Sequence, residues 1–219
     1  MIVVIDGPAG SGKSSTAKAV ASKLGIQYLD SGALYRATTL VYLQSNHDRN
    51  KFFDQLKSIN ITFNYSNLYF HIYINSIEVS AEIRSMEVSN HVSEVASMPE
   101  VRQFVNILMN DAVQKSIYIA DGRDLGTAVF PNAKMKFFMI ADLETRAKRR
   151  LLEIKDQDSE VTLEQILLNI SERDQKDSNR DADPLKQADD AIEIDTSTFE
   201  FEEQVEFICN KIKPLLNSK

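Results

Sequence analysis

The 219 residues are enough for one α/β core with small insertions, and 43% apolar with 26% charged residues is typical of a soluble globular protein. The net charge of −7 argues against broad nucleic-acid binding, and no apolar run approaches the roughly 20 residues needed to span a membrane. Cys209 is the only cysteine, which excludes an intrachain disulfide and a cysteine-rich zinc site; with no secretory signal pattern, we expect a reducing, cytoplasmic location.

The first predicted element is a buried strand at residues 2–5 that ends abruptly in a glycine-rich loop. Gly7-x4-Gly12-Lys13-Ser14 fits the phosphate-binding pattern G-x-x-x-x-G-K-[ST] at every fixed position, and a helical pattern follows at once. Glycines let backbone N–H groups converge on phosphate oxygens, and the helix points its positive end at the same anion. Lys13 can reach the β- and γ-phosphates, and the Ser14 hydroxyl can ligate Mg²⁺. We therefore expect ATP or GTP on the loop residues Gly7, Pro8, Ala9, Gly10, Ser11, Gly12, Lys13, Ser14 and Ser15.

The next elements are a short strand at residues 26–30 and a helix from about Ala33 to Gln44, which Asp30-Ser31-Gly32 caps. A polar break at 45–50 follows. Two runs of alternating apolar residues, 59–65 and 68–74, predict a β-hairpin that turns around Tyr65-Ser66-Asn67. Because the rest of the pattern indicates parallel strands with crossover helices, the hairpin is an inserted subdomain.

Helical spacing resumes near Val88, and Pro99 opens a strongly amphipathic helix. Two buried strands are predicted at 117–120 and 135–141, followed by a basic helix and a charged, mobile-looking segment at 155–160. A capping box at Thr162 and Gln165 opens a helix that reaches roughly Arg173, before an irregular stretch at 175–184. The last elements are a strand at 191–195 and a helix near 200–216.

These elements predict an α/β fold with a three-layer phosphate-loop NTPase core, a parallel five-stranded sheet, a small antiparallel β insertion and a helical lid. Ligands in such a fold bind at the carboxyl ends of the strands. We expect a single domain over 1–219, with the core at about 1–50, 81–148 and 170–219, the insertion at 51–80 and the lid at 149–169.

Arginines flank several of the predicted ligand-side ends. Arg36 lies one helical turn past Ser31-Gly32, and Arg123 and Asp124 end a strand. Arginine suits phosphate because its planar group donates two hydrogen bonds to phosphate oxygens. A solvated surface position explains any single arginine, but the group as a whole indicates a second site for a phosphorylated molecule. Its members are Arg36, Arg84, Arg102, Arg123, Arg173 and Arg180.

Several motifs together resemble the bacterial cytidylate kinases of the nucleoside-monophosphate kinase superfamily. They span nearly the whole chain in the expected order, and the second and fourth are far more specific than the phosphate loop. The motifs are Gly7–Ser15, Asp30-Ser-Gly-Ala-Leu-Tyr-Arg36, Val79-Ser-Ala-Glu-Ile-Arg84, Ile119-Ala-Asp-Gly-Arg-Asp-Leu-Gly-Thr127 with Val129-Phe-Pro131, and Glu172-Arg-Asp-x-x-Asp-x-x-Arg180 with Pro184-Leu185.

The resemblance implies phosphoryl transfer from ATP to CMP or dCMP with Mg²⁺, by a monomer that uses neither nucleic acid nor a membrane. It implies that Lys13, Arg36 and Arg123 act in catalysis. It further implies three groups of acceptor contacts: to cytosine, from Ser31, Arg102, Asp124 and Arg180; to the sugar, from Ser93, Arg173 and Asp177; and to the acceptor phosphate, from Arg36, Arg123 and, more weakly, Arg84.

The chemistry of these side chains is consistent with that reaction. A carboxylate such as Asp124 can accept from the cytosine amino group, whereas uracil would present a carbonyl oxygen to it. No general base is required, because a phosphate monoester with a second pKa of about 6 is already mostly ionised at pH 7. Positioning and charge neutralisation therefore carry the rate.

Water competes for the γ-phosphate, so a transferring site must close over both substrates. The insertion at 51–80 is expected to close over the monophosphate side and the lid over ATP. An inserted segment that takes no part in closure explains either of them too. Asp121 is a candidate to support Mg²⁺, and a role in capping the following turn is equally consistent with the sequence.

Three alternatives remain open. The first is a kinase for another monophosphate, such as UMP or AMP, against which the cytosine-reading residues argue. The second is a GTP-dependent switch, which would carry an Asn-Lys-x-Asp motif that the sequence lacks. The third is a module that only stores nucleotide, which turnover with a monophosphate would exclude.

Overall fold

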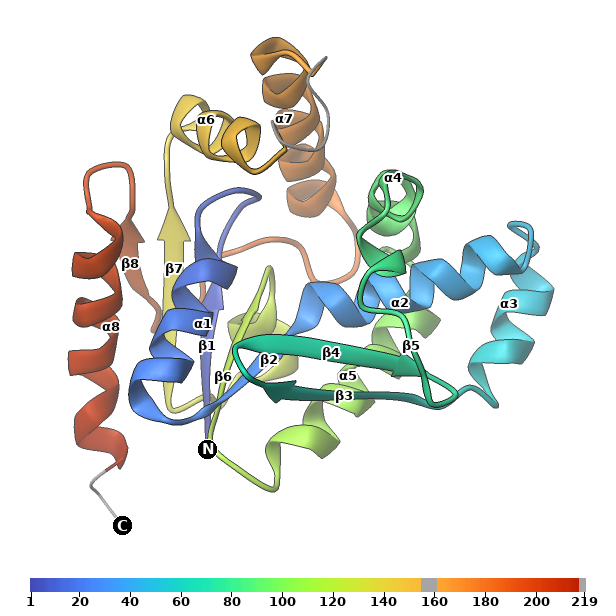
Figure 1. Ribbon diagram of the computed structural model, residues 1–219, viewed down its shortest axis with the longest axis horizontal. Helices are drawn as coiled ribbons and strands as arrows, with labels where there is room; N and C mark the ends of the chain where they lie inside the picture. The colour runs from blue at the N-terminus through green and yellow to red at the C-terminus, as the bar shows by residue number, and fades with distance from the viewer. Residues whose placement is uncertain (155–160, 217–219) are drawn as a thin grey trace.

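A parallel five-stranded sheet forms the centre of the computed structural model, which describes residues 1–154 and 161–216 (Figure 1). The strand order is β2-β6-β1-β7-β8, with every neighbouring pair parallel, as predicted. Val3, Val4 and Ile5 of the central strand β1 are fully buried, and the phosphate loop leaves from this strand in the middle of the sheet. The strands are β1 (Ile2–Asp6), β2 (Gln27–Asp30), β6 (Tyr118–Gly122), β7 (Met135–Ile140) and β8 (Ile192–Asp195).

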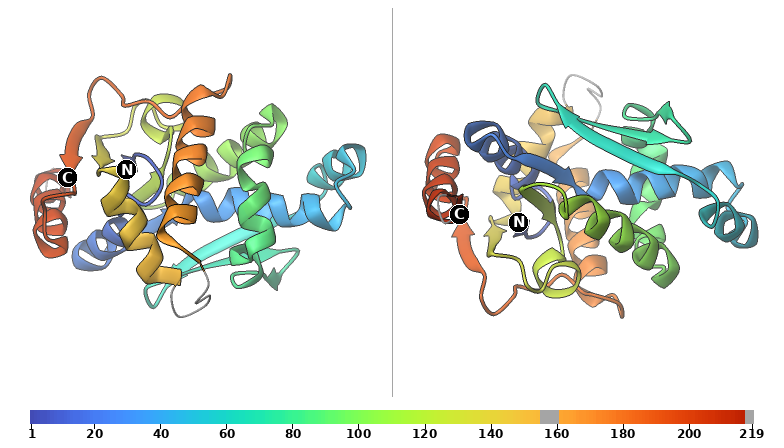
Figure 2. Two further views of the ribbon diagram at one scale, coloured as in Figure 1. Left: turned by 90° about the horizontal axis from the view of Figure 1, so that it is seen from above. Right: turned by 90° about the horizontal axis from the view of Figure 1, so that it is seen from below.

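Helices pack around the sheet and across the edge where its strands end. Helices α1 (Lys13–Leu24) and α8 (Phe201–Leu216) lie side by side, while α2 (Ser31–Gln44) packs on α4 (Met86–Val95) and α5 (Pro99–Val113). Figures 1 and 2 show α6 (Leu143–Ile154) and α7 (Leu163–Asn179) crossing above the carboxyl ends of the strands. None of the described helices has the length and apolar character that a membrane crossing requires.

The insertion contains a helix that we did not predict. Helix α3 (Arg49–Leu56) begins within the supposed polar break, because Asp48 caps it by accepting from the N–H groups of Asn50 and Lys51. Phe52 and Leu56, one helical turn apart, are both buried. The break therefore ends at a helix start rather than extending to residue 50.

The predicted hairpin is present as β3 (Ile61–Ser66) and β4 (Tyr69–Ile74), with a short third strand, β5 (Ile77–Glu78), added. Asn67 and Leu68 form its turn with φ angles of 52° and 68°. The expected strand position of Leu68 is therefore wrong, and its side chain is 58% exposed at the tip. The antiparallel sheet packs against β2 and α2.

Helices α6 and α7 are joined to the phosphate loop by a small apolar cluster. The capping box of Thr162 and Gln165 is confirmed, but α7 continues to Asn179 instead of ending near Arg173. Ala147 and Ile170 pack in a cluster with Ala9 of the loop. The segment 155–160, for which we predicted a charged, mobile connection, lies outside the described residues. Two short turns complete the fold, a 3₁₀ turn at Glu82–Arg84 and a π-helical turn at Leu125–Val129.

Candidate active site

The phosphate loop approaches β7 so closely that its first position must be glycine. Gly7 has φ +147°, and a Cβ atom there would lie 2.0 Å from the Met139 carbonyl oxygen. Lys13 is buried at the start of α1, and its Nζ donates to the Pro8 carbonyl at 2.6 Å and to Ser11 Oγ at 3.2 Å. Burial and the neighbouring Arg123 lower the pKa of Lys13. The lysine is thus held over its own loop, where an anion would strengthen its charged form.

Side chains from three later elements hold the loop in place. Asp174 on α7 accepts from the Ala9 N–H at 3.0 Å, and Arg146 on α6 donates to the Ala9 carbonyl at 2.9 Å. Arg146 and Asp174 also pair with each other. Thr196, after β8, donates to the Ser11 carbonyl at 3.1 Å. Arg146, the first arginine of the basic helix α6, therefore holds the phosphate loop through its backbone.

Ser14 and Asp121 form a small cluster of hard oxygen ligands beside the loop. Ser14 Oγ donates to Asp121 Oδ2 at 2.6 Å, which joins the start of α1 to the end of β6. Among the described residues, no group of three or more His, Cys, Asp or Glu side chains could hold a metal ion. A hydroxyl with one carboxylate fits Mg²⁺, which takes few protein ligands and completes its shell with phosphates and water.

Asp6, which the sequence analysis missed, caps the turn after β6. Its carboxylate accepts from the Leu125 N–H at 2.9 Å and from the Gly126 N–H at 2.7 Å. In the described residues Asp6 accepts from the N–H groups of this turn, while Asp121, for which the sequence left a capping role open, accepts from Ser14 and Tyr28. Burial raises the pKa of Asp6 to about 6, against the effect of the two N–H donors. Asp6 therefore fixes the segment that carries Arg123 and Asp124.

Most of the predicted anion-binding arginines line a cavity of about 250 Å³ at the carboxyl ends of β2 and β6. Residues 83–96 form one wall, and no residue of the 51–80 insertion lines it. Arg102 lies behind the wall, with its guanidinium over the Tyr35 ring at 5.7 Å. The other nine predicted acceptor residues line the cavity: Ser31, Arg36, Arg84, Ser93, Arg123, Asp124, Arg173, Asp177 and Arg180.

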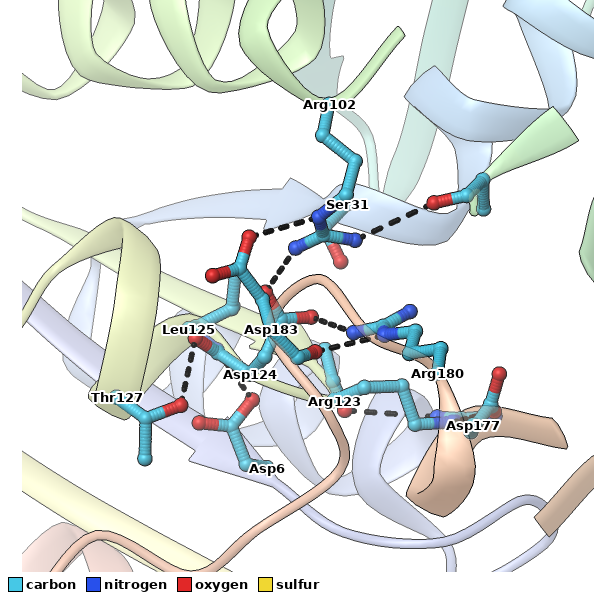
Figure 3. Close-up of polar contacts among 12 residues, drawn as sticks. Asp6, Ser31, Arg102, Arg123, Asp124, Leu125, Thr127, Asp177, Arg180 and Asp183 are labelled. Carbon is cyan, nitrogen blue, oxygen red and sulfur yellow. Dashed lines mark hydrogen bonds and ion pairs between the residues drawn. The ribbon is translucent and has the colours of Figure 1, made fainter. Parts of the chain in front are cut away.

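Figure 3 shows the polar contacts around Asp124, which lines this cavity. Its carboxylate pairs with Arg102 and, at 2.6 Å, with Arg180. Arg102 also contacts Asp183 at 2.8 Å. Burial raises the pKa of Asp124, and the two guanidiniums oppose that rise. A buried, hydrogen-bonded carboxylate of this kind can discriminate between an amino group and a carbonyl group on a ligand.

Three further arginines, Arg36, Arg123 and Arg173, give the cavity the positive charge that an anion would need. Arg123 pairs with Asp177 at 2.9 Å, and Arg36 donates to Ser89 Oγ at 2.9 Å. Arg173 Nε is buried without a hydrogen-bond partner among the described residues. Burial and the nearby Arg123 lower the pKa of Arg173 to about 10. An unpaired buried N–H group and several like charges both favour a bound phosphate.

A second cavity, of about 370 Å³, lies between the phosphate loop and helices α6 and α7. Its wall includes loop residues, Arg149 and the two phenylalanines Phe199 and Phe201, whereas Gly7, Pro8 and Ser11 belong to the loop without lining the cavity. The two cavities share a wall, so a group bound in one faces a group bound in the other. The shared residues are Ser14, Arg36, Arg123 and Arg173.

A phosphate loop that meets an arginine-rich acceptor cavity defines a phosphotransferase of the phosphate-loop kinase class. The cytidylate kinase family model matches residues 3–214. The chain is 44% identical over 217 residues to a cytidylate kinase of Fusobacterium nucleatum, covering 97% of each chain. It is 43% identical over 214 residues to one of Clostridium botulinum, covering 96% of this chain and 97% of the other. The chain belongs to the cytidylate kinase family.

The fold is also found in a solved structure of low sequence similarity. The crystal structure of TT1252 from Thermus thermophilus is 16% identical and covers 100% of this chain and 98% of that one, with a TM-score of 0.51. At this identity the similarity supports the fold alone.

Proposed function

We propose that the protein transfers the γ-phosphoryl group of ATP to CMP or dCMP, giving ADP and CDP or dCDP. The observation that carries this proposal is the wall common to the two cavities, to which three arginines and Ser14 contribute and which would lie between donor and acceptor. Membership of the cytidylate kinase family supports the same reaction. An acceptor phosphate oxygen attacks the γ-phosphorus, and the bond to the β–γ bridging oxygen breaks as ADP leaves.

On the donor side, the loop N–H groups and Lys13 would hold the β- and γ-phosphates of ATP. Ser14, supported by Asp121, would hold Mg²⁺, which supplies charge neutralisation at the phosphates when bound. Phe199 and Phe201 line the same cavity and offer aromatic surface to a base. This chain's residues thus orient the donor and place positive charge along the path of the phosphoryl group.

On the acceptor side, Arg36 and Arg123 would grip the phosphate, with Arg84 beside them. The cytosine contacts would come from Ser31, Asp124 and Arg180, with Arg102 acting from behind through Asp124. The sugar contacts would come from Ser93, Arg173 and Asp177. Because Arg173 lines both cavities, its guanidinium would also face the transferring group.

Several further expectations stay predictions. They are the division into core, insertion and lid, the closing movements, the monomeric state and the cytoplasmic location. Cys209 is a free, buried cysteine, which is consistent with a reducing compartment. A kinase for UMP is the alternative, since uracil differs from cytosine only at the edge that Asp124 and its arginine partners would read.

The proposal is tested by ADP formation from ATP and Mg²⁺ with CMP, dCMP, UMP, AMP, GMP or no acceptor. We expect rapid turnover with CMP and dCMP and little with the others. A comparable rate with UMP would favour the alternative acceptor. Equal rates with and without any acceptor would indicate an ATPase or a nucleotide switch and would overturn the proposal.

A further inference from the structure

Tyr28 on β2 is fully buried, yet its hydroxyl reaches the edge of the active site. Tyr28 Oη donates to Asp121 Oδ1 at 2.6 Å. Burial, together with the charge of Asp121, raises the pKa of the Tyr28 hydroxyl well above its usual range, so it stays a donor. The bond crosses from β2 to the adjacent strand β6, where Tyr28 is paired with Ile119, two residues before Asp121.

The same carboxylate holds the phosphate-loop serine. Asp121 Oδ2 accepts from Ser14 Oγ at 2.6 Å, so Tyr28 and Ser14 occupy one oxygen each. A hydroxyl has a single hydrogen and two lone pairs. Because Asp121 takes the hydrogen of Ser14, the lone pairs of that hydroxyl stay available to a cation. A carboxylate free to turn away would release Ser14 from this orientation.

The ring of Tyr28 is clamped by the antiparallel sheet. Tyr65 on β3 contacts it edge-on with ring centroids 5.4 Å apart, and Phe70 on β4 does so at 5.9 Å. Lys18 Nζ covers the ring at 5.6 Å from its centroid. Edge-to-face pairs of this kind are favourable beyond the apolar area that they bury, so they hold the ring in one orientation. A continuous chain of contacts therefore runs from the insertion through Tyr28 and Asp121 to Ser14.

This series of contacts suggests a role for the hairpin that its distance from the cavities does not otherwise explain. No residue of 51–80 lines either cavity. Two of its aromatic side chains, Tyr65 and Phe70, nevertheless pack against Tyr28, which donates to Asp121. Residues that orient a metal ligand from behind typically change metal affinity or activity by about 10- to 100-fold when they are lost.

We propose that Tyr28 is a positioning residue for Mg²⁺-dependent nucleotide binding, acting through Asp121 on Ser14, and that the β3–β4 hairpin supports it. The proposal rests on the donor half of the proposed function, namely Mg²⁺ and ATP at the phosphate loop. It does not depend on the identity of the acceptor.

The test compares Tyr28→Phe with Tyr65→Phe. Each substitution removes one hydroxyl and keeps the ring, and the hydroxyl of Tyr65 is buried without a partner among the described residues. Isothermal titration measures binding of the β,γ-imido analogue of ATP with Mg²⁺ and in EDTA. We expect Tyr28→Phe to reduce the tightening caused by Mg²⁺ by about 10- to 100-fold and to leave affinity in EDTA within twofold. Tyr65→Phe should match the wild type.

A second measurement asks whether Tyr28 acts through Asp121. Adding Tyr28→Phe to Asp121→Asn should change the Mg²⁺ dependence no further than Asp121→Asn alone. Thermal midpoints of all variants separate folding from binding. The proposal is overturned if Tyr28→Phe binds the analogue like Tyr65→Phe, if it weakens binding equally with and without Mg²⁺, or if the two substitutions are additive. A wild type that binds the analogue with Mg²⁺ but never turns over CMP would instead refute the proposed function alone.

Discussion

Replacing Asp124 with asparagine removes the carboxylate that pairs with two buried guanidiniums, those of Arg102 and Arg180. Asparagine keeps one acceptor oxygen and turns the other into a donor, which then faces Arg102 or Arg180. We expect two separable effects: a loss of stability from the disrupted ion pairs, and a loss of preference for cytosine over uracil. The second effect bears on function, because an NH₂ group can donate to the uracil carbonyl that a carboxylate repels.

The magnitudes follow from the contacts. Breaking a buried ion pair costs about 3–5 kcal/mol. Here the lower end applies, because both arginines keep other acceptors: Arg102 contacts Asp183 Oδ2, and Arg180 donates to the Asp183 carbonyl at 2.6 Å. In a chain of this size, about 3 kcal/mol lowers the thermal midpoint by roughly 6–12 °C. A hydrogen bond to a charged group contributes about 1.5–3 kcal/mol, so the CMP/UMP ratio of kcat/KM should fall by about 10- to 150-fold.

The assay is steady-state ADP formation with CMP and with UMP at saturating ATP, alongside a thermal melt. Asp183→Asn is the matched control, because Asp183 pairs with the same Arg102 but does not line the acceptor cavity. Its φ of 49° is one that asparagine tolerates. The control should lose some stability and keep the CMP/UMP ratio. A folded Asp124→Asn enzyme with an unchanged ratio would refute the assignment of Asp124 to cytosine.

Two further predictions concern the phosphate loop, and a third concerns Asp6 at the end of β1. Gly7→Ala should lower the thermal midpoint and abolish measurable ATP binding by titration, because its Cβ would collide with the Met139 carbonyl. Lys13→Met should lower kcat by about 10²–10³ with little change in CMP affinity, because a charge on the phosphoryl path is lost. Asp6→Asn should alter the pH dependence of stability measured by urea unfolding. The pKa of Asp6 is raised from 3.8 to about 6, so its stabilising contribution is complete below pH 3.8 and is lost as the pH rises through 6. Wild-type stability minus that of the variant should therefore fall by roughly 2–3 kcal/mol between pH 4 and pH 7.

Each of these has a result that would contradict it. Gly7→Ala with wild-type affinity for ATP would mean that the loop can move away from β7. Lys13→Met that weakened CMP and ATP binding alike would indicate a general collapse of the site. A stability difference between wild type and Asp6→Asn that stayed constant with pH would show that Asp6 titrates normally in the fold.

The elements that the sequence predicts best are those whose local pattern and chemistry agree. The phosphate loop, the capping box at Thr162 and the hairpin each carry fixed residues at fixed spacings. Helix α3 escaped prediction because it has eight residues and only Phe52 and Leu56 as a buried pair. The full length of α7 was missed because residues 175–179 are polar, although Asp177 is held by Arg123 across the cavity.

The interior polar contacts could not be predicted, because they join residues far apart in the chain. Asp6 is bonded to residues about 120 positions later, and Tyr28 to one 93 positions later. A charged residue at the end of the apolar run 2–5 was the one local signal for Asp6. Nothing in the order of residues indicated that Arg102 would lie behind Asp124 rather than line the cavity, since this depends on the packing of α5 against α2.

The fate of the γ-phosphoryl group tests the central claim most directly. ATP labelled at the γ-phosphorus is incubated with the protein, Mg²⁺ and CMP, and the labelled products are separated. The shared wall between the two cavities predicts one labelled CDP for each ADP formed and almost no labelled inorganic phosphate. Label that appears as inorganic phosphate whether or not CMP is present would contradict the account, because water, and not CMP, would then be the acceptor.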